Sequence, residues 1–308
     1  MAQMRTVTAV SVVVATRDRD ELLLRALGAI AAQDHGGAVE IIVVRDRSEV
    51  TELGLDLPAG VRLRQVVNDR SPGLAGARNT GVLLAAEDLV AFCDDDDEWL
   101  PGKLSAQLEL LEANPQASLA ATGIVVVHDG MESPRPGPTE PVELGQLLDD
   151  RIMELHPSTF LFRRADLLDR IGLVDEDLPG GYGEDYELLL RAAALGPVVS
   201  VPRPLVRIHW HGSSYYFSRW QTIHESLESL LAKHPEFERS PRGTARIRGQ
   251  QAVALAAMGR RREALGGAAR TLRHSPVEPR GWIAAAAALR LVDIERLQRR
   301  LHRRGRGL

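Results

Sequence analysis

The sequence predicts an α/β protein with a doubly wound central sheet, followed by an all-helical C-terminal region. Short apolar runs rich in β-branched residues alternate with segments of helical periodicity over roughly the first two thirds of the 308 residues. After about Tyr216 the strand-like runs stop, and only helical segments follow. One of the apolar runs leads straight into four aspartates at residues 94–97, which places acidic groups at an edge of the predicted sheet.

The first 115 residues contain four predicted strands. Residues 7–15 form a continuous, largely β-branched run, which is typical of a strand buried on both faces. The helical spacing within residues 20–33 comes from Leu22, Leu23, Leu27 and Ile30. Further strands are expected at 39–44, 61–67 and 89–93, and helices at 79–87 and 101–113.

The rest of the chain is less regular at first and then helical. We expect strands at 118–128, 159–163 and 198–202, and helices at 165–171 and 186–195. The proline-rich run 133–138 predicts an exposed loop. Helices are expected at 220–233, 244–258, 261–272, 281–291 and 294–304. Residues 255–276 resemble a single tetratricopeptide-like unit, which predicts one helical hairpin because no second copy is visible.

Composition places the chain among soluble globular proteins, with 44% hydrophobic and 26% charged residues. A single cysteine, Cys93, excludes an internal disulfide framework and a cysteine-rich zinc site, and it fits a reducing compartment. The apolar stretch 9–15 is far too short to cross a bilayer and is bounded by charges. We therefore expect a cytoplasmic protein.

Charge is distributed unevenly along the chain. Residues 239–308 contain 17 arginines, no lysine and four acidic residues, although the whole chain carries a net charge of −4. The preceding part is therefore strongly acidic, which argues against nucleic acid as its substrate. The basic helices leave an anionic partner open: a membrane surface that they contact from the cytoplasmic side, or the acidic part of a second copy. A solvated arginine-rich face is the simpler alternative.

The four aspartates at 94–97 are the strongest chemical signal. They follow a buried strand, and adjacent negative charges repel one another unless a counter-charge is present. A hard divalent cation such as Mg²⁺ or Mn²⁺ supplies that charge and accepts carboxylate and phosphate oxygens. The alternative is an exposed acidic turn before the next helix, where the helix dipole favours negative charge.

Five segments in order resemble the family 2 glycosyltransferases of the GT-A fold. They are VSVVVATRDRDELLLRAL, EIIVVRDRS, GLAGARNTG, VAFCDDDDEWLPGKL and GEDYELLLRAA, and the resemblance covers roughly residues 7–216. It implies a mixed central sheet flanked by helices in a domain over residues 1–215. Within that domain, residues 1–115 would form the nucleotide-sugar half and 116–215 the acceptor half. Residues 216–308 then form a basic helical extension.

The resemblance also implies where the donor and a divalent cation bind. Asp94, Asp95 and Asp96 resemble the DxD element, with Asp96 as the direct metal ligand and with Asp94 or Asp95 in contact with ribose or, through water, with the metal. His211 matches a histidine that lies near metal and diphosphate in similar sequences. The nucleoside and diphosphate contacts implied are Ala15, Thr16, Arg17, Asp46, Arg78, Asp94 and Asp95. For Arg78, an exposed helix arginine is the alternative.

The implied chemistry is a single displacement by an acceptor hydroxyl. Glu184 and Asp185 resemble the acidic catalytic pair of the family, with Asp185 as the base and Glu184 shaping its surroundings. Capping of the helix that follows is the alternative role of the pair. The expected enzyme is a metal-dependent, inverting glycosyltransferase of the hexosyltransferase type. Its acceptor is a hydroxyl group in glycan, polysaccharide or glycoconjugate synthesis, with lipid-linked acceptors included.

Departures from the family pattern leave the nucleotide unassigned. Arg45, Asp46 and Arg47 stand where the family usually has two aspartates and a glycine. Two other functions remain open. A nucleotidyltransferase also uses acidic residues on an α/β sheet, but residues 15–20 lack the glycine-rich loop expected for it. A catalytically weak nucleotide-binding scaffold would act through its helices, and it would have no need of Asp94, Asp96 and Asp185 together.

Overall fold

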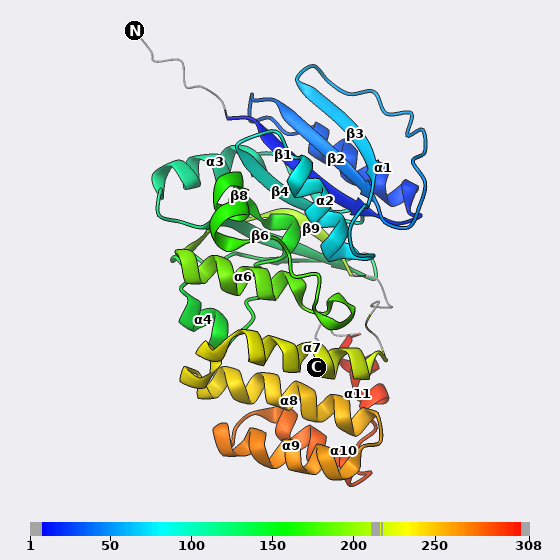
Figure 1. Ribbon diagram of the computed structural model, residues 1–308, viewed down its shortest axis with the longest axis vertical. Helices are drawn as coiled ribbons and strands as arrows, with labels where there is room; N and C mark the ends of the chain where they lie inside the picture. The colour runs from blue at the N-terminus through cyan, green and yellow to red at the C-terminus, as the bar shows by residue number, and fades with distance from the viewer. Residues whose placement is uncertain (1–7, 211–215, 217, 303–308) are drawn as a thin grey trace. The chain divides into compact units, whose positions relative to one another are not determined.

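The computed structural model describes residues 8–210, 216 and 218–302 and contains two compact units (Figure 1). The first unit comprises the described residues up to Leu144, together with Ile152–Glu176 and Leu188–Trp210. The second comprises Gly145–Arg151, Asp177–Glu187 and the described residues after Trp210. The domain boundary that the sequence predicts between residues 215 and 216 remains a prediction. In the structure, residues 145–151 and 177–187 belong to the same compact unit as the C-terminal helices.

The first unit is built on a mixed sheet that has nine strands among the described residues. The order is β3-β2-β1-β4-β8-β6-β9-β5, with β7 paired to β6. The strands β1 to β4 are parallel, whereas β8 is antiparallel to both β4 and β6. Their bounds are β1 Val10–Thr16, β2 Val39–Arg45, β3 Val61–Val67, β4 Leu89–Asp94, β5 Glu98–Trp99, β6 Leu119–His128, β7 Met131–Arg135, β8 Leu161–Arg163 and β9 Val198–His209. A mixed sheet is what the family resemblance implies.

Helices pack on this sheet as the sequence periodicity predicts. Helix α1 (Asp20–Ala31) buries Leu23, Leu27 and Ile30 against the apolar strands. Helix α3 (Lys103–Ala113) contributes Leu104 and Leu111 to the same core. The other helical segments of this unit are α2 (Leu74–Leu84), the 3₁₀ turn η1 (Pro157–Thr159), α5 (Arg164–Asp166), the π-helical turn η2 (Leu167–Ile171) and the part of α6 (Glu184–Leu195) from Leu188 onward.

Three predicted element boundaries are wrong. Helix α2 begins at Leu74 rather than at residue 79, because Gly73 and Gly76 make its first turn look like a loop, and it ends at Leu84 rather than at 87. Residues 133–135 belong to the edge strand β7 and not to a loop, since proline is tolerated where one side of a strand has no partner. Strand β9 continues to His209, past residue 202, with a register shift opposite β6 at Gly123.

The second unit is helical. Helix α8 (Pro241–Ala257) contacts α7 (Trp220–Lys233), α9 (Arg261–His274) and α10 (Pro279–Ala288). The remaining segments are α4 (Leu144–Asp149), which the sequence analysis did not predict, η3 (Pro179–Gly181), the first turn of α6 (Glu184–Leu195), η4 (Pro235–Arg239) and α11 (Ile294–His302). In the described part of the chain, no helix has the length and apolar character needed to span a membrane.

Two short segments are fastened to these helices by buried polar contacts. The Tyr186 hydroxyl donates to the backbone oxygen of Leu147 at 2.6 Å and accepts from Arg246 at 2.6 Å. His234 contacts Glu187 at 3.1 Å. These contacts explain why residues 145–151 and 177–187 group with the helical region although they lie far from it in the sequence.

Candidate active site

Parallel pairing brings the carboxyl ends of three strands to one edge of the sheet. Ala15 of β1 is paired with Asp94 of β4, and Thr16 is paired with Arg45 of β2. Ligands of open α/β sheets bind at this edge. Of the predicted donor-binding residues, the structure therefore brings Ala15, Thr16, Asp46 and Asp94 together on neighbouring strand ends, whereas the side chain of Arg17 is exposed.

Asp95 is held by the end of β1 and by the residue before α1. Thr16 Oγ1 donates to Asp95 Oδ2 at 2.6 Å, and Arg19 pairs with the same carboxylate. Burial raises the pKa of Asp95 to about 6, although the Thr16 hydrogen bond and the Arg19 charge oppose the rise. Arg19 also donates to Asp96 Oδ2 at 3.0 Å. Sequence reasoning missed Arg19, since an exposed arginine before a helix has no distinguishing local pattern.

Arg78 reaches the acidic run from helix α2. It is 2% exposed and donates to Asp94 Oδ1 at 2.6 Å. Its guanidinium lies 5.5 Å from the centre of the Phe92 ring. The alternative of an exposed helix arginine is therefore wrong. Arg78 therefore supplies positive charge beside Asp94.

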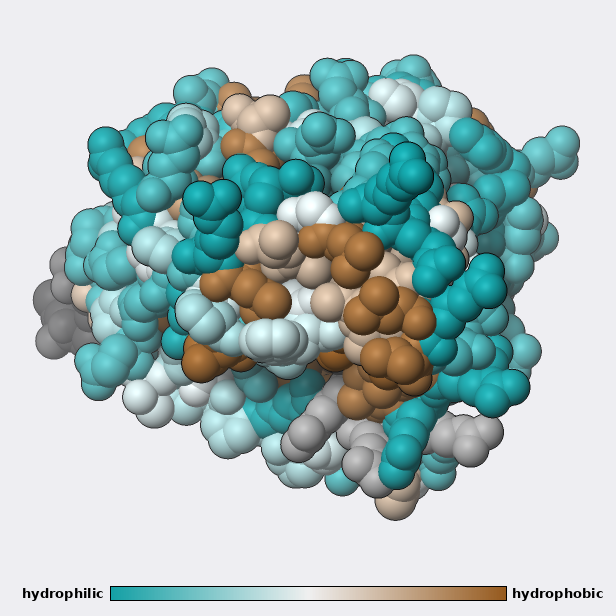
Figure 2. All heavy atoms as spheres, turned by 90° about the horizontal axis from the view of Figure 1, so that it is seen from below, coloured by the Kyte–Doolittle hydropathy of each residue, from teal (hydrophilic) through white to brown (hydrophobic). Residues whose placement is uncertain are grey.

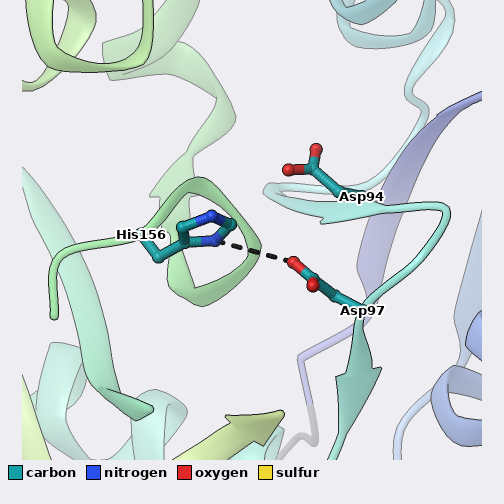
Figure 3. A group of neighbouring side chains, drawn as sticks. All are labelled: Asp94, Asp97 and His156. Atoms are coloured by element: carbon teal, nitrogen blue, oxygen red, sulfur yellow. Dashed lines mark ion pairs between the residues drawn. The ribbon is translucent and has the colours of Figure 1, made fainter. Parts of the chain in front are cut away.

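Three side chains offer a metal-ligand set. The potential ligand atoms of Asp94, Asp97 and His156 all lie within 4.8 Å of one another, and the three residues point toward one another in Figure 3. His156 Nδ1 lies 3.6 Å from Asp97 Oδ2. Asp94 ends β4, Asp97 follows in the turn to β5, and His156 precedes η1. Ser158 ties the group together, because its Oγ donates to Asp97 at 2.5 Å and accepts from the backbone N–H of Asp94 at 3.0 Å.

Asp97 shows that this group fits a cation. Burial, together with the charges of Asp94 and Asp96, raises the pKa of Asp97 well above its usual value, because hydrogen bonds offset the burial only in part. A divalent cation would supply the missing positive charge and favour the ionised carboxylate. Two carboxylates and one imidazole suit Mn²⁺ well, and the carboxylates suit Mg²⁺.

The predicted metal ligands are only partly gathered in this group. Asp94 belongs to it, whereas Asp96 contacts Arg19, and direct coordination by Asp96 remains a prediction. His211 lies outside the described residues. Sequence reasoning missed Asp97 and His156 as ligands. His156 comes near the acidic run only in the folded chain, where its neighbour Ser158 contacts both Asp94 and Asp97.

Asp46 orders a loop beside the strand ends. Its Oδ1 accepts from Asn68 Nδ2 and from the backbone N–H of Gly73, each at 2.9 Å. The preceding residue, Arg45, is 1% exposed and donates to Gln65 at 2.9 and 3.0 Å. Its guanidinium is therefore used inside the fold rather than presented to a nucleotide base.

Glu176 joins the same loop to helix α2 and was not predicted. It accepts from Asn79 at 2.6 Å and also contacts Arg70 and Ser71. Burial alone would raise the pKa of Glu176, but these hydrogen bonds outweigh it and lower the pKa to about 2. The ionised carboxylate fixes α2 and therefore the backbone that carries Arg78.

The predicted catalytic pair lies in the second unit. Glu184 and Asp185 occupy the first turn of α6, where acidic residues favour the helix dipole. Arg151 forms an ion pair with Asp185, and Glu184 is buried. The structure thus confirms the helix-start position of both residues, while their catalytic role remains a prediction.

Comparison with known proteins defines the class of this protein. The sequence profile described as glycosyl transferase family 2 matches residues 11–171, more than half of the chain. The match includes Thr16, Asp46, Arg78 and the run 94–97. The chain belongs to glycosyl transferase family 2 and is a glycosyltransferase.

Curated relatives extend the similarity. The amylovoran biosynthesis glycosyltransferase AmsB of Erwinia amylovora is 25% identical over 246 residues, 74% of this chain and 79% of that protein. The succinoglycan biosynthesis protein ExoO of Rhizobium meliloti is 31% identical over 199 residues, 61% of this chain and 56% of that protein. WfgD of Escherichia coli, a UDP-Glc:alpha-D-GlcNAc-diphosphoundecaprenol beta-1,3-glucosyltransferase, is 25% identical over 105 residues, 34% of this chain and 42% of that protein.

Solved structures share the fold. S. aureus TarS 1–349 in complex with UDP-GlcNAc aligns with a TM-score of 0.57 and 18% identity, over 97% of this chain and 92% of that one. The mannosyltransferase PcManGT of Pyrobaculum calidifontis, in complex with GDP-Man and Mn²⁺, aligns with a TM-score of 0.55 and 18% identity, over 94% and 82%. These likenesses confirm the GT-A type of fold that the sequence predicts.

Proposed function

We propose that this glycosyltransferase is a metal-dependent, inverting hexosyltransferase that moves a sugar from a nucleoside-diphosphate sugar to an acceptor hydroxyl. One observation carries the proposal. Asp94 ends a buried strand between the Arg78 guanidinium and the Asp97–His156 pair. Carboxylates for a cation thus stand beside a fixed positive charge, an arrangement suited to a diphosphate that bridges the two.

The donor side follows from this arrangement. Asp94 would hold Mn²⁺ or Mg²⁺ together with Asp97 and His156, or with Asp96 as the sequence implies. When bound, the cation neutralises charge that develops on the leaving nucleoside diphosphate. Arg78 adds positive charge on the other side of Asp94, and Thr16 and Asp46 border the place for the nucleoside. The GDP-Man and Mn²⁺ bound to PcManGT and the UDP-GlcNAc bound to TarS support a cation and a nucleotide sugar of this kind.

The acceptor side rests on Asp185. As the acceptor oxygen attacks the anomeric carbon, Asp185 would take the hydroxyl proton while the bond to the diphosphate breaks. One displacement inverts the anomeric centre and needs no covalent intermediate. Arg151 is the counter-ion that keeps the Asp185 carboxylate in place. Glu184 shapes the surroundings of the base from the same helical turn.

Polysaccharide synthesis is the process that we propose for this reaction. The names of AmsB and ExoO refer to amylovoran and succinoglycan biosynthesis. The name of WfgD includes a diphosphoundecaprenol acceptor, which is a sugar carried on a lipid. These relatives support a lipid-linked saccharide as the source of the acceptor hydroxyl.

Calorimetric titration tests the donor site. We expect one nucleoside diphosphate among UDP, GDP, ADP and dTDP to bind in the presence of Mn²⁺ and to lose at least tenfold in affinity when the cation is removed. Asp94→Ala should abolish this metal-dependent gain, whereas the exposed Asp129→Asn should leave it unchanged. Comparing Asp96→Ala with His156→Ala distinguishes the two ligand sets. Absence of binding to every nucleotide, with and without metal, would instead favour the scaffold.

Steady-state kinetics tests the catalytic base. We expect Asp185→Asn to lower kcat by roughly 10²–10⁴-fold, the range of general-base contributions, and to leave donor affinity unchanged. The exposed Glu225→Gln in α7 is a matched control in the same unit. Equal kcat values for Asp185→Asn and the wild type would assign Asp185 to capping of α6 alone.

A further inference from the structure

The end of the helical unit formed by α10 and its flanking turns carries exposed apolar side chains. Val277 is 85% exposed, Leu291 75% and Trp282 59%. Leu289, which directly follows the end of α10, is also exposed. Figure 2 shows apolar side chains gathered at this end and surrounded by hydrophilic ones. We call Val277, Trp282, Leu289 and Leu291 the apolar face.

An exposed apolar face of this kind is typical of a surface that binds another molecule or a membrane. A helical hairpin at the end of a stack usually exposes polar residues, because an apolar outer surface invites association. The Trp282 side chain suits an interface between water and lipid. Its apolar ring is exposed, and its polar Nε1 is already satisfied because it donates to the backbone oxygen of Pro276 at 2.9 Å.

Positive charge without an ion-pair partner lies in the same part of the helical unit as the apolar face. Residues 260–292 contain seven arginines and two acidic residues. Both acids are neutralised, Glu263 by Arg260 and Glu278 by Arg280. Within the described chain, no carboxylate lies within ion-pair distance of the other five, which are Arg261, Arg262, Arg270, Arg273 and Arg290. Arg290 stands directly between Leu289 and Leu291, and Arg261 donates to the backbone oxygen of Ala288 beside them.

We propose that the apolar face rests on the surface of a bilayer rich in anionic phospholipid. Apolar side chains would enter the headgroup region, and neighbouring arginines such as Arg261 and Arg290 would contact lipid phosphates. A symmetric contact with a second copy is less suitable, because it would bring two sets of unpaired arginines together. The proposal goes beyond the transferase reaction, and vesicle binding is measured without donor or acceptor, so the two proposals can fail separately.

Flotation of the full chain with vesicles tests the proposal. We expect binding to vesicles of 70% phosphatidylcholine and 30% phosphatidylglycerol, at least tenfold weaker binding to pure phosphatidylcholine, and weakening of the first by 0.5 M NaCl. Two double variants should each reduce binding to the anionic vesicles at least tenfold: Leu289→Ser with Leu291→Ser, and Arg273→Gln with Arg290→Gln. The matched controls are Met131→Ser, an exposed apolar residue of β7, and Arg203→Gln/Arg242→Gln, which removes the same charge elsewhere.

Three results would overturn the proposal. These are equal binding to both kinds of vesicle, wild-type binding by the two test variants, and no binding to either vesicle. Sedimentation equilibrium tests the main alternative, a contact between two copies of the chain. If the wild type is a dimer and the double variant Leu289→Ser with Leu291→Ser is a monomer, the apolar face is an interface between copies. Circular dichroism of each variant shows whether its helices are intact.

Discussion

Lys103 is a charged residue in the core of the first unit. It is fully buried, and its Nζ donates to Gln107 at 2.7 Å and lies 3.8 Å from the centre of the Trp99 ring. Burial lowers the pKa of Lys103 to about 7. Gln107 in turn donates to the backbone oxygens of Ala120 and Thr159. Lys103 therefore belongs to a polar network behind the strand that ends at Asp94.

The stability of the protein should depend on pH through Lys103. Between pH 7 and about 10.5 the unfolded chain binds this proton and the folded chain does not, so wild-type stability rises with pH across that window and is constant below it. Lys103→Met lacks this contribution. Denaturant unfolding at pH 7 and 9.5 should show the wild type gaining on Lys103→Met by about 1 kcal/mol or more. A difference that is the same at both pH values would contradict the shift.

At the scale of single residues, the sequence predicts those site residues that follow one another at the end of a strand. Asp94, Asp95 and Asp96 stand in one run after an apolar strand, and a local pattern suffices to find them. Arg19, His156 and Glu176 come from other segments and meet the site only through tertiary contacts. No spacing within one segment distinguishes them from ordinary surface residues.

Helix α2 shows the same limit at the scale of an element. Its glycines lower helix propensity, yet the helix needs them, because a Cβ at Gly81 would lie 2.3 Å from Val13 Cγ1 of β1. A Cβ at Gly76 would likewise lie 1.9 Å from the backbone oxygen of Ser71. Close packing places α2 where Arg78 reaches Asp94. Regular elements such as β1 and α1 were predictable because their periodicity matches their burial, whereas the start of α2 depends on its neighbours.

Two alanine substitutions should separate packing from propensity. Gly81→Ala should destabilise the protein by roughly 1–3 kcal/mol, as overpacking does, and should weaken nucleotide binding by displacing α2. Gly28→Ala, within α1, should stabilise it by about 0.5–1 kcal/mol, because open space surrounds that position. Thermal and denaturant unfolding measure both. Equal effects from the two substitutions would show that α2 can move away from β1.

At the scale of the whole molecule, the described chain forms two compact units. Both faces of β1 and β4 are buried in the sheet unit, and residues 145–151 and 177–187 belong to the helical unit. The sequence predicts the helical character of the C-terminal region, but it does not predict that residues 145–151 and 177–187 pack with these helices. The contacts of Tyr186 with Leu147 and Arg246 join segments about 40 and 60 residues away, which periodicity does not reveal.

Hydrogen exchange should detect this division. Phe237→Ala removes a side chain buried in the helical unit, at an expected cost of roughly 3–5 kcal/mol. Amide exchange should then quicken in α7, in α8 and in residues 145–151 and 177–187, and remain slow in β1 and β4. Phe162→Ala, equally buried in β8, should produce the reverse pattern. Uniform acceleration throughout the chain after either substitution would mean that the molecule opens as one unit.

Because residues 145–151 and 177–187 pack against helices that come later in the chain, these contacts form in a fixed order during synthesis on the ribosome. Leu147 and Tyr186 leave the exit tunnel before Arg246, the residue that bonds to the Tyr186 hydroxyl. At about 5–20 residues per second, the delay over roughly 60 residues lasts about 3–12 s. During that interval the nascent first turn of α6, which carries Asp185, lacks its contact with α8. Codons that slow translation before residue 246 would lengthen that interval.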